Sequence, residues 1–194
     1  AMGSVPAGAA LRRDGAAAGD EVWVSGVPGE AALALRLWQD GGLAVDQAAA
    51  TPHLEALRLR LLRPTPRLAL GQALRGMASA AIDISDGLSA DLGHLCRASG
   101  LGASLHLEAL PVSPALAALV PGAQAWPLQA GGGDDYELCF TAPAAAHAQV
   151  LAAAAASDTP VHCIGVLHIG DQVTWRKRDG ACWQPDRAGY DHFS

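Results

Sequence analysis

The sequence predicts one domain of mixed strands and helices, in which the helices cover a sheet. Short runs with strand periodicity alternate with longer runs of helical periodicity along the chain. Hydrophobic residues make up 51% of the 194 residues, which is enough for a sizeable core. No repeat or low-complexity linker divides the chain, so a single unit is expected.

The first half of the chain carries signals for two strands and four helices. A turn at 26–29 separates the first strand from the first helix, and Pro64 and Pro66 end the second helix. Gly100 ends the fourth helix. In chain order, we expect a strand at 21–25, a helix carrying Leu33 and Leu37, helices at 45–62 and 67–77, a strand at 79–85 and a helix at 88–98.

The second half continues the alternation and ends in a hairpin. Pro114 and Pro143 are tolerated in the first turn of a helix, and the alanine-rich stretch after Pro143 favours helix. A glycine turn at 131–133 precedes a strand. In chain order, we expect a strand at 103–107, a helix at 114–120, a strand at 136–141, a helix at 143–156, a strand at 161–167 and a hairpin at 172–183.

Composition excludes several classes of protein. The chain has 19 acidic and 13 basic residues, which argues against nucleic-acid binding. No long uncharged apolar run and no basic leader occurs, so we expect no membrane span and a cytoplasmic protein. The four cysteines form no Cys-x-x-Cys pair and are interpreted as core residues. The start Ala-Met-Gly suggests either a cloning remnant or a cut inside a longer chain, and we expect 1–20 to be a lead-in to a domain at 21–194.

The strongest local signal is the segment AIDISDGL at 81–88. Strand alternation places Ile82 and Ile84 on one face and Asp83 and Ser85 on the other, and Asp86 follows where a helix begins. The oxygen atoms of these side chains can bind Mg²⁺, and the N-terminus of the following helix can face a phosphate. The metal ion would then lie between the carboxylates and the phosphate. The residues alone leave open the alternative that Asp86 caps the helix and Ser85 turns the chain.

A second signal is the glycine-rich acidic turn at 131–137, whose glycines allow backbone to approach a ligand closely. A solvated acidic turn is the alternative. The loop at 25–30 lacks the phosphate-loop and dinucleotide fingerprints and is interpreted as a structural turn. Arg12 and Arg13 either contact an anion or are solvated. The seven histidines do not cluster into a metal or catalytic pattern.

Taken together, these segments resemble thiamine-monophosphate kinases nearly from end to end. That family belongs to a superfamily with aminoimidazole-ribonucleotide synthetase, selenophosphate synthetase and a hydrogenase-maturation protein. The segments that carry the resemblance are 5–13 with Gly15, WVSGVPG at 23–29, RPTPR at 63–67, AIDISDGL at 81–88, DLGH at 91–94, GGDDYELCF at 132–140 and GYDHF at 189–193.

The resemblance implies an α+β fold, a three-layer α/β/α domain with a mixed sheet, like the C-terminal domain of aminoimidazole-ribonucleotide synthetase. It implies phosphorylation of thiamine monophosphate by ATP, with Mg²⁺ between the phosphates and no catalytic side chain in this domain. The residues that it assigns are Asp83 and Asp86 as metal ligands, Ser85 and Arg13 as ATP contacts, and Asp134 and Tyr190 as contacts to thiamine phosphate.

The sequence departs from the family in two respects. The family usually has Glu at the position of Asp134, so this acid is one methylene shorter, and Asp135 or a water is a candidate to compensate. By the resemblance, we expect this chain to start where the family's N-terminal domain ends, and that domain carries most of the metal-binding aspartates and forms the homodimer. We therefore expect the isolated chain to be a poor kinase. The competing interpretations are aminoimidazole-ribonucleotide synthetase and a non-catalytic module that binds Mg²⁺-nucleotide.

Overall fold

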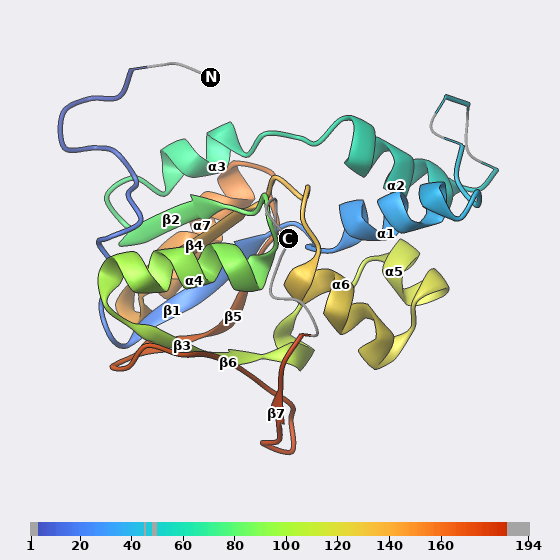
Figure 1. Ribbon diagram of the computed structural model, residues 1–194. Helices are drawn as coiled ribbons and strands as arrows, with labels where there is room; N and C mark the ends of the chain where they lie inside the picture. Colours follow the sequence, from blue (N-terminus) through green and yellow to red (C-terminus); the bar gives the residue numbers. More distant parts are fainter. Residues whose placement is uncertain (1–3, 45, 48–49, 186–194) are drawn as a thin grey trace.

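A single mixed sheet of seven strands organises the protein (Figure 1). The computed structural model describes residues 4–44, 46–47 and 50–185. The strand order is β2-β4-β1-β5-β3-β6-β7, and the adjacent strands are antiparallel except for β3 and β6, which are parallel. The strands are β1 Asp20–Ser25, β2 Ala80–Asp83, β3 Gly102–His106, β4 Leu138–Pro143, β5 Val161–His168, β6 Val173–Arg176 and β7 Cys182–Trp183.

Helices lie on both faces of this sheet, as the three-layer prediction requires (Figure 1). They are α1 Glu30–Gln39, α2 Pro52–Leu62, α3 Leu68–Ala73, α4 Leu88–Ser99, α5 Pro114–Leu119, α6 Trp126–Gly131 and α7 His147–Ala156, with short 3₁₀ turns at Leu107–Ala109, Gly122–Ala125 and Ala144–Ala146. On one face of the sheet, the α4 helix contributes Leu92 and Leu95 to the core. On the other face, α3 and α7 enclose Trp23 and Phe140. The predicted α+β fold with a mixed sheet is confirmed.

A third apolar cluster lies beside one end of the sheet. Leu33 of α1, Leu57 of α2 and Leu116 of α5 are buried together there. This cluster fixes α1 and α2 relative to each other. The pairing matters for the site because α1 begins, and α2 ends, next to the acidic turn described below.

Local chemistry explains where most helices begin and end. The α1 helix starts after Gly29, whose φ of 93° is accessible to glycine, and α4 stops at Gly100, whose φ is 68°. The predicted helix at 45–62 is too long, because Thr51 caps a helix that begins at Pro52. Residues 46–47 lie before this helix, and Val45 lies outside the described residues.

Three further predictions need correction. The strand expected at 136–141 begins only at Leu138, because Tyr136 has a φ of 50°, which ends strand geometry. Pro143 closes β4 instead of opening a helix, and α7 begins at His147. The α6 helix was not predicted, and it runs up to the glycine turn at Gly131.

The cysteines form no disulfide. Cys96 and Cys139 are buried in the core as expected, and burial raises the pKa of Cys96 to about 11, whereas Cys182 is exposed. None of the helices in the described part of the chain combines the length and the apolar composition that crossing a bilayer requires.

Candidate functional site

The two acidic segments singled out in the sequence lie side by side in the structure. Strand β2 pairs with β4, which places Asp83 opposite Leu138. Beyond the strand ends, Asp134 N–H donates to the Ser85 carbonyl and Tyr136 N–H to the Ile84 carbonyl, each at 2.8 Å. These backbone hydrogen bonds join the segments into one surface.

Glycines permit this close approach. A Cβ at Gly133 would lie 2.5 Å from the Ser85 carbonyl oxygen, and a Cβ at Gly87 would lie 2.9 Å from the Gly131 carbonyl oxygen. Gly87 also has a φ of 128°, which side-chain-bearing residues rarely adopt. Glycines of each segment therefore let the other segment's backbone approach closely.

The first segment presents its carboxylates as the alternation predicted. Ile82 and Ile84 are buried, whereas Asp83 is exposed. The helix-capping alternative for Asp86 is wrong, because the N-cap residue of α4 is Gly87.

Asp91, one turn into α4, satisfies the backbone of this segment. Its Oδ2 accepts the N–H groups of Ser85, Asp86 and Gly87 at 2.9, 3.0 and 3.2 Å. A phosphate at this end of α4 therefore cannot rely on those three donors. A cation held by the neighbouring carboxylates is the physically reasonable bridge to such an anion.

In the second segment, exposed and buried side chains alternate. Asp134 and Tyr136 are exposed, whereas Asp135 and Glu137 are 0% exposed. The exposed pair has left-handed backbone, with φ of 64° at Asp134 and 50° at Tyr136. Such geometry costs about 1–3 kcal/mol for a residue other than glycine, so the surrounding contacts must impose it.

Asp135 holds the start of α1. Its carboxylate accepts the N–H of Gly29 at 2.7 Å and of Ala31 at 3.3 Å. Burial raises the pKa of Asp135 to about 7, although these two donors and the charge of Arg60 oppose that rise. Because its side chain is enclosed in this role, Asp135 is not available to compensate for the shorter acid at position 134.

The raised pKa of Asp135 predicts a pH dependence of stability. In the window between its usual pKa of 3.8 and about 7, the folded state holds a proton that the unfolded state has lost. Unfolding free energy should therefore fall as pH rises, by about 2 kcal/mol between pH 5 and pH 7. Urea unfolding of the chain and of Asp135→Asn across this range checks it, since the variant should lose this part of the slope. Equal slopes would contradict the assignment.

Glu137 forms the centre of a buried ion-pair network. Its carboxylate pairs with Arg60 of α2 at 2.8 Å and with Arg67, just before α3, at 2.6 Å. It also accepts the hydroxyl of Ser25, and a Cβ at Gly26 would collide with it. The loop at 25–30 is thus held by hydrogen bonds to the buried carboxylates of Glu137 and Asp135, which agrees with its interpretation as a structural turn.

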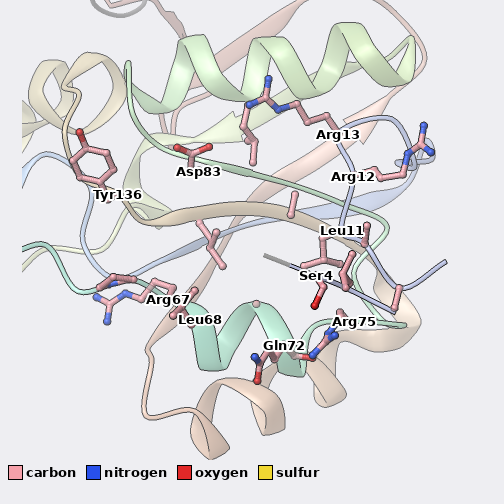
Figure 2. Close-up of a pocket in the computed structure, with 18 of the residues that line it drawn as sticks. Ser4, Leu11, Arg12, Arg13, Arg67, Leu68, Gln72, Arg75, Asp83 and Tyr136 are labelled. Atoms are coloured by element: carbon pink, nitrogen blue, oxygen red, sulfur yellow. The ribbon is translucent and has the colours of Figure 1, made fainter. Parts of the chain in front are cut away.

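A cavity of about 860 Å³ opens beside the edge strand β2. It lies between the N-terminal segment, α3 and β2, and Figure 2 shows Arg13, Asp83 and Tyr136 around it. Its walls are mostly apolar, with arginines among them, and its size suits a small ligand. The lining includes Leu11, Arg12, Arg13, Arg67, Leu68, Gln72, Arg75, Ala81, Asp83, Tyr136 and Leu138.

The N-terminal segment forms one wall of this cavity. The Arg12 carbonyl accepts the N–H of Ala81, so the segment runs along the free edge of β2. Both arginines line the cavity, but the Arg12 guanidinium binds Asp14 at 2.8 and 2.5 Å. Of the two predicted anion contacts, the geometry favours Arg13, because Arg12 already has an acidic partner.

Carboxylates lie near Tyr136 at one end of the cavity. Asp134 is the main cause of a raised pKa of the Tyr136 phenol, and Asp83 and Asp86 add to it. In the described part of the chain, no three acidic, histidine or cysteine side chains converge closely enough to hold a metal ion. A Mg²⁺ ion bound by Asp83 and Asp86 would need phosphate oxygens and water to complete its shell, as in sites that take one or two carboxylates.

The structure thus brings most of the predicted site residues together. Ser85 and Asp134 are joined by backbone, and Asp83 lines the same cavity as Arg13. Tyr190 lies outside the described residues. Sequence reasoning missed Arg60, Arg67 and Asp91 as supporting residues. The signal in the sequence was Arg60, a charged residue on an apolar helix face next to Leu57 and Leu61, which indicates a buried acidic partner.

Comparisons with known proteins show which families and proteins this chain resembles. A family model described as AIR synthase related protein, C-terminal domain, matches residues 17–175. The thiamine-monophosphate kinase of Salmonella typhimurium is 44% identical over 192 residues, which are 99% of this chain and 58% of that protein. The chain therefore spans less than two thirds of the length of this relative.

Solved structures show the same likeness. The crystal structure of thiamine-monophosphate kinase from Stenotrophomonas maltophilia K279a has a TM-score of 0.86 and 47% identity, over 92% of this chain and 56% of that one. AaThiL complexed with AMPPCP and TMP has a TM-score of 0.72 and 30% identity, over 94% of this chain and 54% of that one. By its sequence match, this chain belongs to the family of the AIR synthase related protein, C-terminal domain, and it is similar to the matching part of thiamine-monophosphate kinases.

Proposed function

We propose that this chain is the C-terminal part of an ATP-dependent thiamine-monophosphate kinase, with 1–20 as a lead-in and 21–194 as its C-terminal domain. The observation that carries the proposal is the joining of the two acidic segments at one end of a ligand-sized cavity. The similarity to thiamine-monophosphate kinases, and to a protein that binds AMPPCP, an ATP analogue, together with TMP, supports the choice of reaction.

In this proposal, Asp83 and Asp86 hold Mg²⁺, and Ser85 and Arg13 contact ATP. Bound Mg²⁺ neutralises charge on the phosphates. Arg13 is suited to its role because it lines the same cavity as Asp83 and carries a permanent positive charge. Ser85 lies between the two acids in sequence, and its hydroxyl is the proposed contact to the phosphates of ATP.

Asp134 and Tyr190 are the proposed contacts to thiamine monophosphate. Asp134 is exposed beside Ser85, on the surface shared by the two segments. Phosphoryl transfer depends mainly on positioning and charge neutralisation. The domain can therefore contribute by orienting its substrates, without supplying a nucleophile. The full-length protein is proposed to be a cytoplasmic homodimer formed through its N-terminal domain, with no nucleic-acid or membrane partner.

An assay of the full-length kinase tests this function directly. With ATP, Mg²⁺ and thiamine monophosphate, we expect thiamine diphosphate to form at roughly 1 per second or faster, whereas the 194-residue chain alone gives no detectable product. Product analysis by chromatography measures both. Binding of Mg²⁺-nucleotide with no response to thiamine monophosphate would instead indicate a non-catalytic module, and turnover of an aminoimidazole-ribonucleotide precursor would indicate the other enzyme of the superfamily.

A further inference from the structure

Tyr136 presents its ring in an unusual way. Its backbone φ of 50° is one that bulky side chains rarely adopt, yet its side chain is 45% exposed. Apolar burial alone is therefore a weak explanation for keeping an aromatic residue here. Backbone strain of this kind tends to occur at ligand sites, where surrounding contacts hold it in place.

The residues on either side fix this conformation. Asp135 is buried against the start of α1, and Glu137 is buried between two arginines. Tyr136 N–H donates to the Ile84 carbonyl at 2.8 Å. A shift of the Tyr136 backbone would break these buried polar contacts. The neighbouring residues therefore hold the Tyr136 side chain in a fixed position.

Negative charge surrounds the exposed ring. The Tyr136 hydroxyl donates to Asp134 Oδ1 at 3.3 Å, which orients the phenol. Asp83 lines the same cavity as Tyr136, and Figure 2 shows both side chains at one end of it. The face of an aromatic ring carries negative potential, so ring and carboxylates together attract a planar cation. They repel an anion that arrives without a metal ion.

We propose that Tyr136 is a substrate-binding residue, whose ring face receives the cationic thiazolium ring of thiamine monophosphate. This inference rests on the proposed function and adds a residue to its acceptor site. ATP has no cationic ring, so the contact distinguishes the two substrates. Asp134 then contributes to substrate binding in two ways: it contacts the substrate itself, and its hydrogen bond with the Tyr136 hydroxyl fixes the orientation of the ring.

Kinetics of the full-length kinase test the inference. Tyr136→Leu removes the aromatic face but keeps apolar bulk, and we expect it to raise KM for thiamine monophosphate about 10-fold and to leave KM for ATP nearly unchanged. Tyr136→Phe keeps the face and should retain most of the affinity. Trp38→Leu, at a 48% exposed aromatic residue of α1 outside the site, is the matched control and should change neither KM.

An uncharged analogue sharpens the test. Thiamine monophosphate with a neutral thiophene in place of the thiazolium should have a KM about 10-fold higher in the wild type, and Tyr136→Leu should reduce that difference, because only the neighbouring carboxylates then favour the cation. An unchanged KM in Tyr136→Leu, an equal loss of ATP affinity, or equal defects in the Leu and Phe variants would overturn the inference while leaving the proposed function standing. A wild-type kinase that forms no thiamine diphosphate would overturn both.

Discussion

Asparagine in place of Asp83 or of Asp86 is expected to lower the turnover number of the full-length kinase by about 100-fold or more. In the proposed Mg²⁺ site, each change removes a negative charge where few protein ligands are to spare, and charge stabilisation by a bound metal contributes several kcal/mol to such reactions. Asp83 is exposed, so its replacement should leave the fold intact. Steady-state assays over a range of Mg²⁺ concentrations measure the effect.

The metal dependence separates this explanation from a general loss of activity. Both variants should need more Mg²⁺ for half-maximal rate, and the double variant should lose less than the sum of the single losses, because the two acids serve one ion. Asp171→Asn, an identical change at an exposed acid near the turn before β6, is the matched control and should behave as wild type. Full activity in both site variants would show that these acids are not the metal ligands.

Replacement of Glu137 by Gln is expected to lower the unfolding free energy by about 3 kcal/mol or more. Glu137 is 0% exposed and the side chains of Arg60 and Arg67 are only 17% and 16% exposed, so the variant removes the carboxylate that pairs with both cations and leaves Arg60 paired only with Glu30, at 3.4 Å. The amide retains the volume and some hydrogen bonds, which makes the lost charge the main change. Chemical denaturation of the chain measures the difference.

A surface ion pair provides the contrast. Asp14→Asn removes a carboxylate that pairs with Arg12 in solvent, and its denaturation midpoint should stay unchanged. In the full-length kinase, Glu137→Gln should also weaken thiamine monophosphate binding, because Glu137 supports the backbone that presents Asp134 and Tyr136. A midpoint for Glu137→Gln close to that of wild type would contradict the central role given to this network.

Local sequence pattern predicted the type of most elements and the orientation of some side chains. Alternation correctly placed Ile82 and Ile84 in the core and Asp83 outside, because a strand with one buried face separates the two sets. Gly100 ended α4 as expected. The pattern failed at Tyr136, where contacts from outside the segment impose a left-handed backbone that strand-like alternation gives no reason to expect.

By itself, the sequence therefore determined an α+β domain and two acidic segments with a capacity for chemistry. Only the tertiary structure decided that β2 lies beside β4, which joins those segments into one site. It also decided that Asp134 meets solvent whereas Glu137 is buried between Arg60 and Arg67, residues 77 and 70 positions away in the chain. The physical reason is that periodicity depends on neighbouring residues, whereas the solvation of a carboxylate depends on partners that only the fold brings to it.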